Sequence, residues 1–284
     1  MDLTEAMLNF IDGFRTANMT QNEGDYTGDD GFLHCGVCGE PKECDFCIGS
    51  ITRRTYRACR CDRERADEEK RRREREEAAK QVRKLRNASL MDARFFEARF
   101  ENCIETEANR QNLRICKRYV DRWDTMRDAR QGLLFWGTIG TGKSFAAACI
   151  ANALMDRGVP VAMTSFVKLL DIMNEEYADD VMQRLMKCQL VIFDDLGAER
   201  ETPYAFEKVF NIVDTRERSN LPMIVTTNLT IDQLANEPDE RRARIYDRIL
   251  GSCYPMQWTG SSWRKTEGRE RFRNFKQLIE GDKK

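Results

Sequence analysis

Along the second half of the chain, short apolar runs alternate with stretches whose apolar positions recur every three or four residues. The runs with strand character lie at 133–136, 159–164, 189–194 and 222–227. Helix-forming stretches separate them, such as the alanine-rich segment 145–155. Strands that alternate with helices predict an α/β fold in which a parallel sheet, here expected to have five strands, is covered on both faces.

Capping signals locate further helices between these runs. Thr202 and Pro203 are a favourable N-cap and first helical residue, and an apolar stripe follows them. We also expect helices from Ser165 and from about Asp179, and a helix over 112–126 that leads into the first strand.

Polar residues dominate the chain before residue 90. An apolar patch at 7–11 predicts either a short amphipathic helix or a frayed terminus. Residues 62–86 form a dense run of both charge signs, with acidic-to-basic pairs at i,i+4 such as Glu69 and Arg73. Because the run lacks the apolar seam of a coiled coil, we interpret it as a solvated helical linker rather than a nucleic-acid arm.

Composition narrows the class of protein. Of the 284 residues, 33% are charged and 41% hydrophobic, and the mean hydropathy is -0.65. Neither a transmembrane run nor the basic start of a signal peptide is found, so we expect a cytoplasmic protein. The net charge of -1 argues against a protein that coats nucleic acid through bulk charge, although a local basic face remains compatible with it.

The stretch from Gly137 to Ser144 fits the pattern G-x-x-x-x-G-K-[ST] of a phosphate-binding loop, with a strand before it and a helix after it. Glycines let successive backbone N–H groups face a triphosphate, Lys143 can reach its β and γ phosphates, and the Ser144 hydroxyl can bind Mg²⁺. The residues expected at the nucleotide are Gly137, Thr138, Ile139, Gly140, Thr141, Gly142, Lys143, Ser144 and Phe145.

Two polar signals follow later strands. Asp194 and Asp195 end the apolar run 189–194, and Asn228 follows 222–227. Because ligands of parallel sheets bind at the carboxyl ends of the strands, we expect Asp194 to hold Mg²⁺, Asp195 to polarise the attacking water, and Asn228 to orient that water or contact the γ-phosphate. The structural alternatives are an N-cap or turn for the acidic pair and an Asx turn for the asparagine.

Arginines near the end of the chain are candidates for stabilising a phosphoryl transition state. Several cations fall in 241–248, of which Arg248 is our first choice for a finger acting on a neighbour's nucleotide, with Arg244 in reserve. Arg264, before the last predicted helix, is suited to sensing the nucleotide of its own subunit.

Eleven cysteines do not indicate a disulfide framework in a cytoplasmic chain. Cys35 and Cys38 have the spacing of a zinc knuckle, and a short polar segment has no core in which to bury free thiols. His34 and six cysteines offer more than the four ligands required. The second pair of zinc ligands is therefore either Cys59 and Cys61 or Cys44 and Cys47.

Taken together, these motifs resemble the AAA+ ATPases that load replicative helicases, the DnaC/DnaI family of bacteria and phages, over about 90–279. The resemblance implies sensor I at Asn228, an arginine finger at Arg248 and sensor II at Arg264. It also implies zinc on Cys35, Cys38, Cys59 and Cys61, and a much reduced lid. The related IstB-type transposition helpers share the ATPase motifs but generally lack a cysteine-rich N-terminus.

These interpretations predict three parts: a zinc-binding, partner-docking domain over 1–61, a charged helical linker over 62–89, and an AAA+ ATPase domain over 90–284. The implied function is an ATP- and Mg²⁺-dependent loader that binds a hexameric DnaB-type helicase through its first domain and single-stranded DNA through its ATPase domain. Such a loader is expected to form homo-oligomers when ATP-bound or on the helicase, with slow, stimulated hydrolysis.

Two other functions fit parts of the sequence: an IstB-like regulator of transposition, and a zinc-bearing adaptor whose nucleotide is structural. Candidate DNA contacts are 241–248, Lys168 and the charged run 71–86, none of which interleaves aromatic and basic residues as a stacking platform does.

Overall fold

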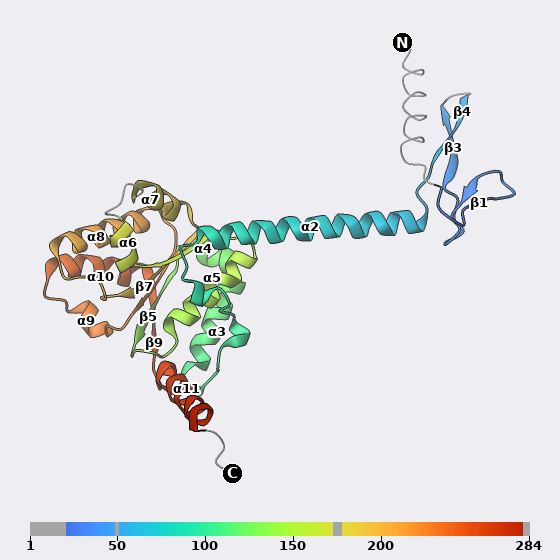
Figure 1. Ribbon diagram of the computed structural model, residues 1–284. Helices are drawn as coiled ribbons and strands as arrows, with labels where there is room; N and C mark the ends of the chain where they lie inside the picture. The colour runs from blue at the N-terminus through green and yellow to red at the C-terminus, as the bar shows by residue number, and fades with distance from the viewer. Residues whose placement is uncertain (1–20, 49–50, 173–177, 281–284) are drawn as a thin grey trace. The chain divides into compact units, whose positions relative to one another are not determined.

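The computed structural model describes residues 21–48, 51–172 and 178–280, and the apolar patch predicted at 7–11 lies outside them (Figure 1). The chain divides into two compact units, Met1–Ala79 and Lys80–Lys284. The boundary falls inside the segment 62–89, which the sequence predicts to be a linker separate from both domains.

The described part of the first unit contains two small antiparallel hairpins and the start of a helix. β1 (Tyr26–Thr27) pairs with β2 (Leu33–His34), and β3 (Glu43–Ile48) pairs with β4 (Ile51–Tyr56). A buried ion pair, with Lys42 Nζ and Asp25 Oδ2 2.7 Å apart, joins the chain before β1 to the chain before β3. Both side chains are almost fully buried, so each charge needs the other as its partner.

The charged run forms α2 (Arg60–Ala88), a helix with no buried residue. Its expected ion pair between Glu69 and Arg73 closes to 2.6 Å, whereas Arg72 turns toward Glu76 at 3.9 Å. Most of the helix is solvated, as the missing apolar seam predicted. Its last turns are the exception, because Leu85 packs partly against the apolar core of the second unit and Arg86 pairs with Asp156 at 2.7 Å.

The second unit is built on a parallel sheet of five strands in the order β6-β7-β8-β5-β9. The strands are β5 (Gly132–Gly137), β6 (Val161–Ser165), β7 (Leu190–Leu196), β8 (Met223–Thr227) and β9 (Cys253–Trp258). The helices of this unit are α3 (Glu107–Asp121), α4 (Trp123–Asp128), α5 (Lys143–Asp156), α6 (Phe166–Ile172), α7 (Ala178–Lys187), α8 (Pro203–Arg218), α9 (Ile231–Ala235), α10 (Glu240–Ser252) and α11 (Trp263–Glu280).

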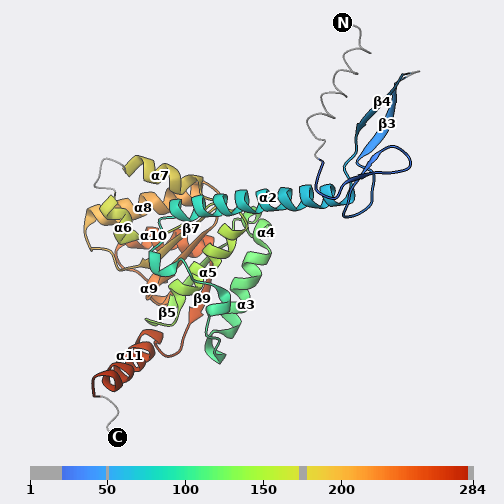
Figure 2. The same cartoon turned by 45° about the vertical axis from the view of Figure 1, so that its right-hand side comes forward.

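Two apolar cores cover the sheet, one on each face. α3 and α5 pack on one face with Phe135 and Ile192, and α6, α8 and α10 pack on the other with Leu134 and Phe193 (Figures 1 and 2). Side chains of successive residues point to opposite faces of a strand, so continuous apolar strands fill both cores. The predicted α/β architecture with a five-stranded parallel sheet is confirmed.

Two elements of this unit differ from the predicted pattern. The helix expected over 112–126 is broken into α3 and α4 at Arg122, whose φ of -105° and ψ of 28° lie outside the helical region. The fifth strand, β9, carries Pro255 and mixes buried with exposed residues, so it lacks the continuous apolar run of the other strands. Proline is tolerated there because β9 is an edge strand and need not donate every N–H.

The opposite edge of the sheet is covered by the chain that enters the unit. The N–H of Met163 in β6 donates to the carbonyl of Ser89, which directly follows α2. Two 3-10 turns, η1 (Ala93–Phe95) and η2 (Phe100–Asn102), then continue along α5. Asn152 of α5 donates to the carbonyls of Phe95 and Ala98 and so fixes this entry segment to the core.

Arg216, a residue of α8, joins the amino ends of two strands. Its fully buried guanidinium donates to the carbonyls of Cys188, Gln189 and Pro222 at 2.7–2.9 Å. Burial lowers the pKa of Arg216 to about 10, so the group is still charged at neutral pH. The amino ends of β7 and β8 therefore share one cation.

We expect Arg216→Met to lower the free energy of unfolding by about 2–4 kcal/mol, because it leaves one buried and two partly buried carbonyls without this donor. The matched control is Arg218→Met on the same helix, whose side chain is 78% exposed and should change stability by less than about 0.5 kcal/mol. Urea unfolding followed by circular dichroism measures both. Equal effects would show that Arg216 is not a structural clamp.

Candidate nucleotide and metal sites

The predicted phosphate-binding loop connects β5 to α5. Gly137, Gly140 and Gly142 have φ values of 128°, 82° and 98°, a region that only glycine enters without strain. The first hydrogen bond of α5 runs from the N–H of Ala146 to the carbonyl of Gly142. The preceding N–H groups of the helix start are therefore available to an anion, and the helix dipole favours negative charge there.

The chain leaving β9 packs directly on this loop. A Cβ atom at Gly140 would lie 2.2 Å from Ser262 Oγ, and one at Gly137 would lie 2.3 Å from the carbonyl oxygen of Trp258. The N–H of Trp263 also donates to the carbonyl of Gly140 at 2.9 Å. Glycine is thus required at both positions by close packing as well as by φ.

Lys143 is the most enclosed cation of the site, with 5% of its surface exposed. Its Nζ donates to the carbonyls of Gly137 and Thr138 and to Asn228 Oδ1, at 2.8–2.9 Å. Burial lowers the pKa of Lys143, and the nearby carboxylates of Asp195 and Asp194 oppose that shift. The amino group therefore joins the phosphate loop on β5 to the end of β8.

Asp194 lies at the end of β7, buried beside the first turn of α5. Its Oδ1 accepts a hydrogen bond from Thr226 Oγ1 at 2.6 Å, and its carboxylate also accepts one from the Ser144 hydroxyl. Burial raises the pKa of Asp194, and these two hydrogen bonds counteract part of that rise. A carboxylate and a hydroxyl in contact are hard oxygen ligands of the kind that Mg²⁺ prefers, so these two residues fit a magnesium ion.

Asp195 lies at an irregularity in the sheet. The pairing of β7 with β8 shifts register between Phe193 and Leu196, and Asp195 has a φ of 57°. Its N–H donates to Thr226 Oγ1 at 3.0 Å, so one threonine contacts both acidic residues. A bulge of this kind changes the direction of a side chain. This one lies at the carboxyl ends of the strands, where the phosphate loop also lies.

Two further arginines lie close enough to influence the site electrostatically. Arg264, at the start of α11, is exposed and lowers the pKa of Lys143. Arg94, in η1, lowers the pKa of Asp194. The sequence pointed to Arg264 but not to Arg94, because no motif surrounds Arg94 and only the folding of the entry segment brings it near β7.

Arg248 faces α8 in the isolated subunit. Its guanidinium pairs with Asp214 at 3.0 Å and lies 4.5 Å from the centre of the Phe210 ring. Arg244, one turn earlier on α10, is exposed and forms no ion pair with any residue that the structure describes. The structure thus places both candidate finger residues on α10, with Arg248 held by an acidic partner and Arg244 without one.

The other residues predicted to lie at the nucleotide differ in their burial. Thr141 is buried and its hydroxyl donates to the carbonyl of Thr138 at 2.9 Å, which stabilises the loop. Ile139 is exposed at the tip of the loop, and Phe145 packs partly against the core formed by α3 and α5.

A second candidate site lies in the first unit. The thiol sulfurs of Cys35, Cys38, Cys59 and Cys61 all lie within 4.8 Å of one another. Backbone N–H groups of Glu40 and Cys61 lower the pKa of Cys38, whereas burial raises that of Cys59. Four converging thiols fit a structural zinc ion, which binds them as thiolates.

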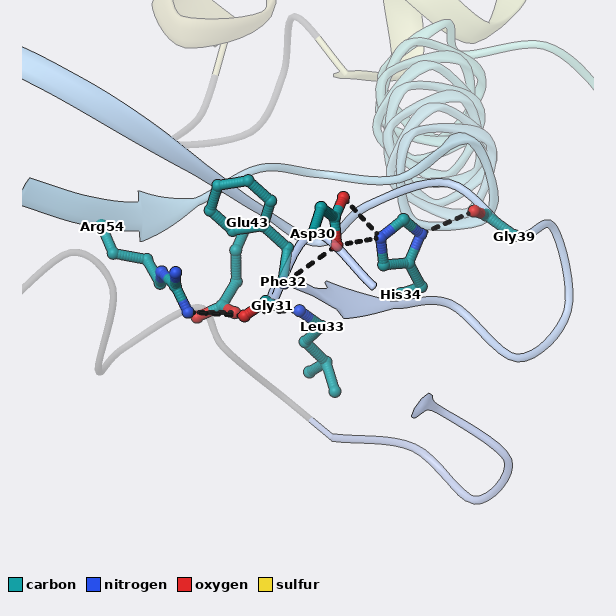
Figure 3. Close-up of polar contacts among 8 residues, drawn as sticks. All are labelled: Asp30, Gly31, Phe32, Leu33, His34, Gly39, Glu43 and Arg54. Atoms are coloured by element: carbon teal, nitrogen blue, oxygen red, sulfur yellow. Dashed lines mark hydrogen bonds and ion pairs between the residues drawn. The ribbon is translucent and has the colours of Figure 1, made fainter. Parts of the chain in front are cut away.

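The alternative ligands lie outside this cluster. Cys44 and Cys47 sit on β3 opposite Thr55 and Thr52, and the Cys47 sulfur lies 3.5 Å from Thr52 Oγ1. In Figure 3 the ring of His34 lies between Asp30 and the carbonyl of Gly39, with nitrogens 3.0 Å from each. These two contacts, with Gly39 first, raise the pKa of His34 and occupy both ring nitrogens.

The same view shows how the two hairpins contact each other. Arg54 of β4 donates to the carbonyl of Gly31 at 2.7 Å, and Glu43 of β3 accepts the N–H of Leu33 at 2.9 Å (Figure 3). The β3–β4 hairpin, in which Cys44 lies, therefore supports the β1–β2 hairpin that leads into Cys35.

The chain is similar to several known proteins. A sequence model of the family described as IstB-like ATP binding protein matches residues 63–271. The replicative helicase loader DnaC of Escherichia coli strain K12 is 26% identical over 206 residues, which cover 69% of this chain and 82% of DnaC. The replicative helicase loader DnaI of Bacillus subtilis strain 168 is 26% identical over 148 residues, 47% of this chain and 48% of DnaI.

A crystal structure of DnaI superposes on this chain with a TM-score of 0.53 at 25% identity, and the match covers 62% of this chain and 98% of that one. The fold of the second unit is that of the AAA+ ATPases. After β9, α11 is the one helix in the described part of the chain, and the reduced lid implied by the resemblance stays a prediction. No helix of the described residues is long and apolar enough to cross a membrane.

Single Cys→Ser changes at Cys35, Cys38, Cys59 or Cys61 should each remove bound zinc from the purified protein, because a serine hydroxyl does not replace a thiolate. Cys44→Ser and Cys47→Ser are the matched controls and should retain it. Elemental analysis by mass spectrometry measures the zinc content. Loss of zinc from the Cys44 or Cys47 variant would show that the ligand set is wrong.

Burial of Asp194 predicts a pH-dependent stability. Its folded pKa lies above the unfolded value of 3.8, so the folded state holds the proton more tightly, and stability falls as pH rises from that value through the folded pKa. At neutral pH, Asp194→Asn should therefore raise the melting temperature of the nucleotide-free protein and weaken binding of Mg-ATP.

Scanning fluorimetry at pH 7.5 and near pH 4 tests this, and the gain in melting temperature should shrink at the lower pH. Asp195→Asn is the control, because it preserves a residue that tolerates positive φ and changes a less buried carboxylate. A lower melting temperature of the Asp194→Asn variant at pH 7.5 would contradict the burial argument.

Proposed function

We propose a function from the premise that this chain belongs to the family of IstB-like ATP-binding proteins. The chain acts as an ATP-switched loader that binds a replicative DnaB-type helicase and places it on single-stranded DNA in the cytoplasm. The observation that supports this most directly is that a nucleotide site and a four-cysteine cluster lie in separate compact units of one chain. One unit can respond to ATP while the other holds a partner.

The geometry of the nucleotide site supports a switch. Lys143 spends its three donors on the phosphate loop and Asn228 in this structure. In our proposal, when ATP binds, the Lys143 ammonium stops donating to the two carbonyls and donates to the phosphates instead. This change alters the hydrogen bond between Lys143 and Asn228 at the end of β8. Lys143 is positioned to bind the negative phosphates of ATP, and Ser144 and Asp194 are positioned to bind Mg²⁺.

Hydrolysis completes the proposed cycle. Asp195 orients the attacking water, Asn228 contacts the γ-phosphate or that water, and Arg264 neutralises charge in cis. An arginine of α10, Arg248 or Arg244, completes the site of a neighbouring subunit, so hydrolysis depends on oligomerisation. Arg248 must first leave Asp214, which would make the basal rate slow. A transition-state arginine contributes about 10³–10⁵ in rate.

The names of the relatives support the partner. DnaC and DnaI are both described as replicative helicase loaders. We assign the docking role to the zinc-binding unit because the family match begins at residue 63 and leaves the four cysteines outside it.

A regulator of transposition remains the second candidate, since the family match covers most of α2 and the ATPase unit but none of the four cysteines. It would act on duplex DNA and a transposase, and the cysteine unit would be dispensable. The two functions thus differ in what removal of zinc should do.

The test is a pull-down of the replicative DnaB-type helicase of the cell in which the chain acts. Full-length protein should retain the helicase. The double variant Cys35→Ser/Cys38→Ser should lose at least about tenfold in affinity while still binding labelled ATP, because a structural zinc site folds only with its metal. The matched control, Cys44→Ser/Cys47→Ser, should bind normally.

Lys143→Ala should bind ATP at least about tenfold more weakly, because it removes a charge-assisted contact to phosphate, and should no longer release helicase on ATP addition. Retention of ATP binding by the wild-type protein together with no helicase capture would reject the loader. Stimulation of a transposase by both zinc-site variants would favour the alternative.

A further inference from the structure

The far part of α11 presents an apolar stripe to solvent. Phe272, Phe275 and Ile279 are spaced i, i+3 and i+7 and so share one face of the helix. Their exposed fractions are 74%, 59% and 67%. In Figures 1 and 2, α11 extends away from the sheet beyond β9, and none of these side chains belongs to either apolar core.

Basic residues surround this stripe. α11 contains six lysines and arginines and three glutamates. Arg271 and Arg273 flank Phe272 in sequence, and Arg269 lies one turn before it. All three arginines are exposed, and none pairs with a carboxylate of the described side chains. Two aromatic rings one turn apart are thus interleaved with cations.

We propose that α11 is a binding surface for single-stranded nucleic acid. Proteins that bind single strands combine cations that follow the phosphates with aromatic rings on which bases stack. Phe272 and Phe275 supply the rings, and Arg269, Arg271 and Arg273 contact the phosphates. A protein groove would bind the same apolar stripe, but the excess of cations on the helix favours a polyanion. The inference rests on the proposed function, in which the ATPase unit holds single-stranded DNA.

The start of the same helix is tied to the nucleotide site. The N–H of Trp263 donates to the carbonyl of Gly140 in the phosphate loop, and Arg264 acts electrostatically on Lys143. A rearrangement of the loop on binding ATP therefore moves the first turn of α11. Affinity for the single strand then depends on the nucleotide bound.

The experiment measures fluorescence anisotropy of a labelled oligodeoxythymidylate with full-length protein, Mg²⁺ and ATP. Phe272→Leu/Phe275→Leu preserves apolar bulk but removes both rings, and should weaken binding at least about tenfold, the scale of losing base stacking. Phe272→Trp/Phe275→Trp preserves the rings and should bind as well as wild type. Binding of labelled ATP and the helical circular dichroism signal should be unchanged in both, which excludes misfolding.

A salt titration tests the cations separately. Arg271→Gln/Arg273→Gln should reduce the slope of log affinity against log salt by about 1.4, since each phosphate contact of a single strand contributes about 0.7. An unchanged slope would remove the arginines from the interface.

The outcomes separate this inference from the function on which it rests. Equal affinity of the leucine variant and wild type, or an equal loss in the leucine and tryptophan variants, would overturn the stacking surface. A leucine variant that binds DNA normally but loses the helicase would assign the stripe to a protein partner instead. Absence of any wild-type binding to the single strand also rejects the inference, while the helicase pull-down still decides the loader.

Discussion

The burial of one ammonium group organises the second unit. Lys143 is held away from water, where an unpaired cation would be strongly destabilising, and three oxygens from β5, its loop and the residue after β8 satisfy it. Asp194 and Asp195 supply the opposing charge from β7. The order of the sheet, in which β5 and β7 both neighbour β8, is what lets three separate segments converge on that nitrogen. Any ligand that competes for Lys143 therefore acts on all three strand ends at once.

Much of this arrangement could be predicted because it depends on local patterns. The phosphate loop, Asp194 and Asn228 each follow an apolar run, and the geometry of parallel strands brings such strand ends together. β9 escaped the pattern because an edge strand needs neither a continuous apolar run nor every N–H, so Pro255 is tolerated. Arg94 escaped because its position depends on how the entry segment folds along α5 and not on its neighbours in sequence.

The ligand set of the cysteine cluster could not be predicted from the sequence and depends on tertiary structure. Spacing alone left two pairs open beside Cys35 and Cys38. The β3–β4 hairpin distinguishes the two pairs. Its antiparallel register places Cys44 and Cys47 along β3, outside the cluster, whereas Cys59 and Cys61 lie at the start of α2, within the cluster. Similarly, the sequence ranked Arg248 as the finger but could not show its ion pair with Asp214, which belongs to the packing of α10 on α8.

Both edge strands of the sheet lack a backbone donor that an added strand could use. Ser89 occupies a backbone donor of β6, and Pro255 removes one from β9. Open edges are the usual route to uncontrolled sheet extension and aggregation. In the oligomer that we propose, copies of this chain would therefore associate through side chains rather than through a shared sheet. Contacts of that kind can form and dissociate with each turn of the proposed nucleotide cycle, whereas a continuous intermolecular sheet would persist through it.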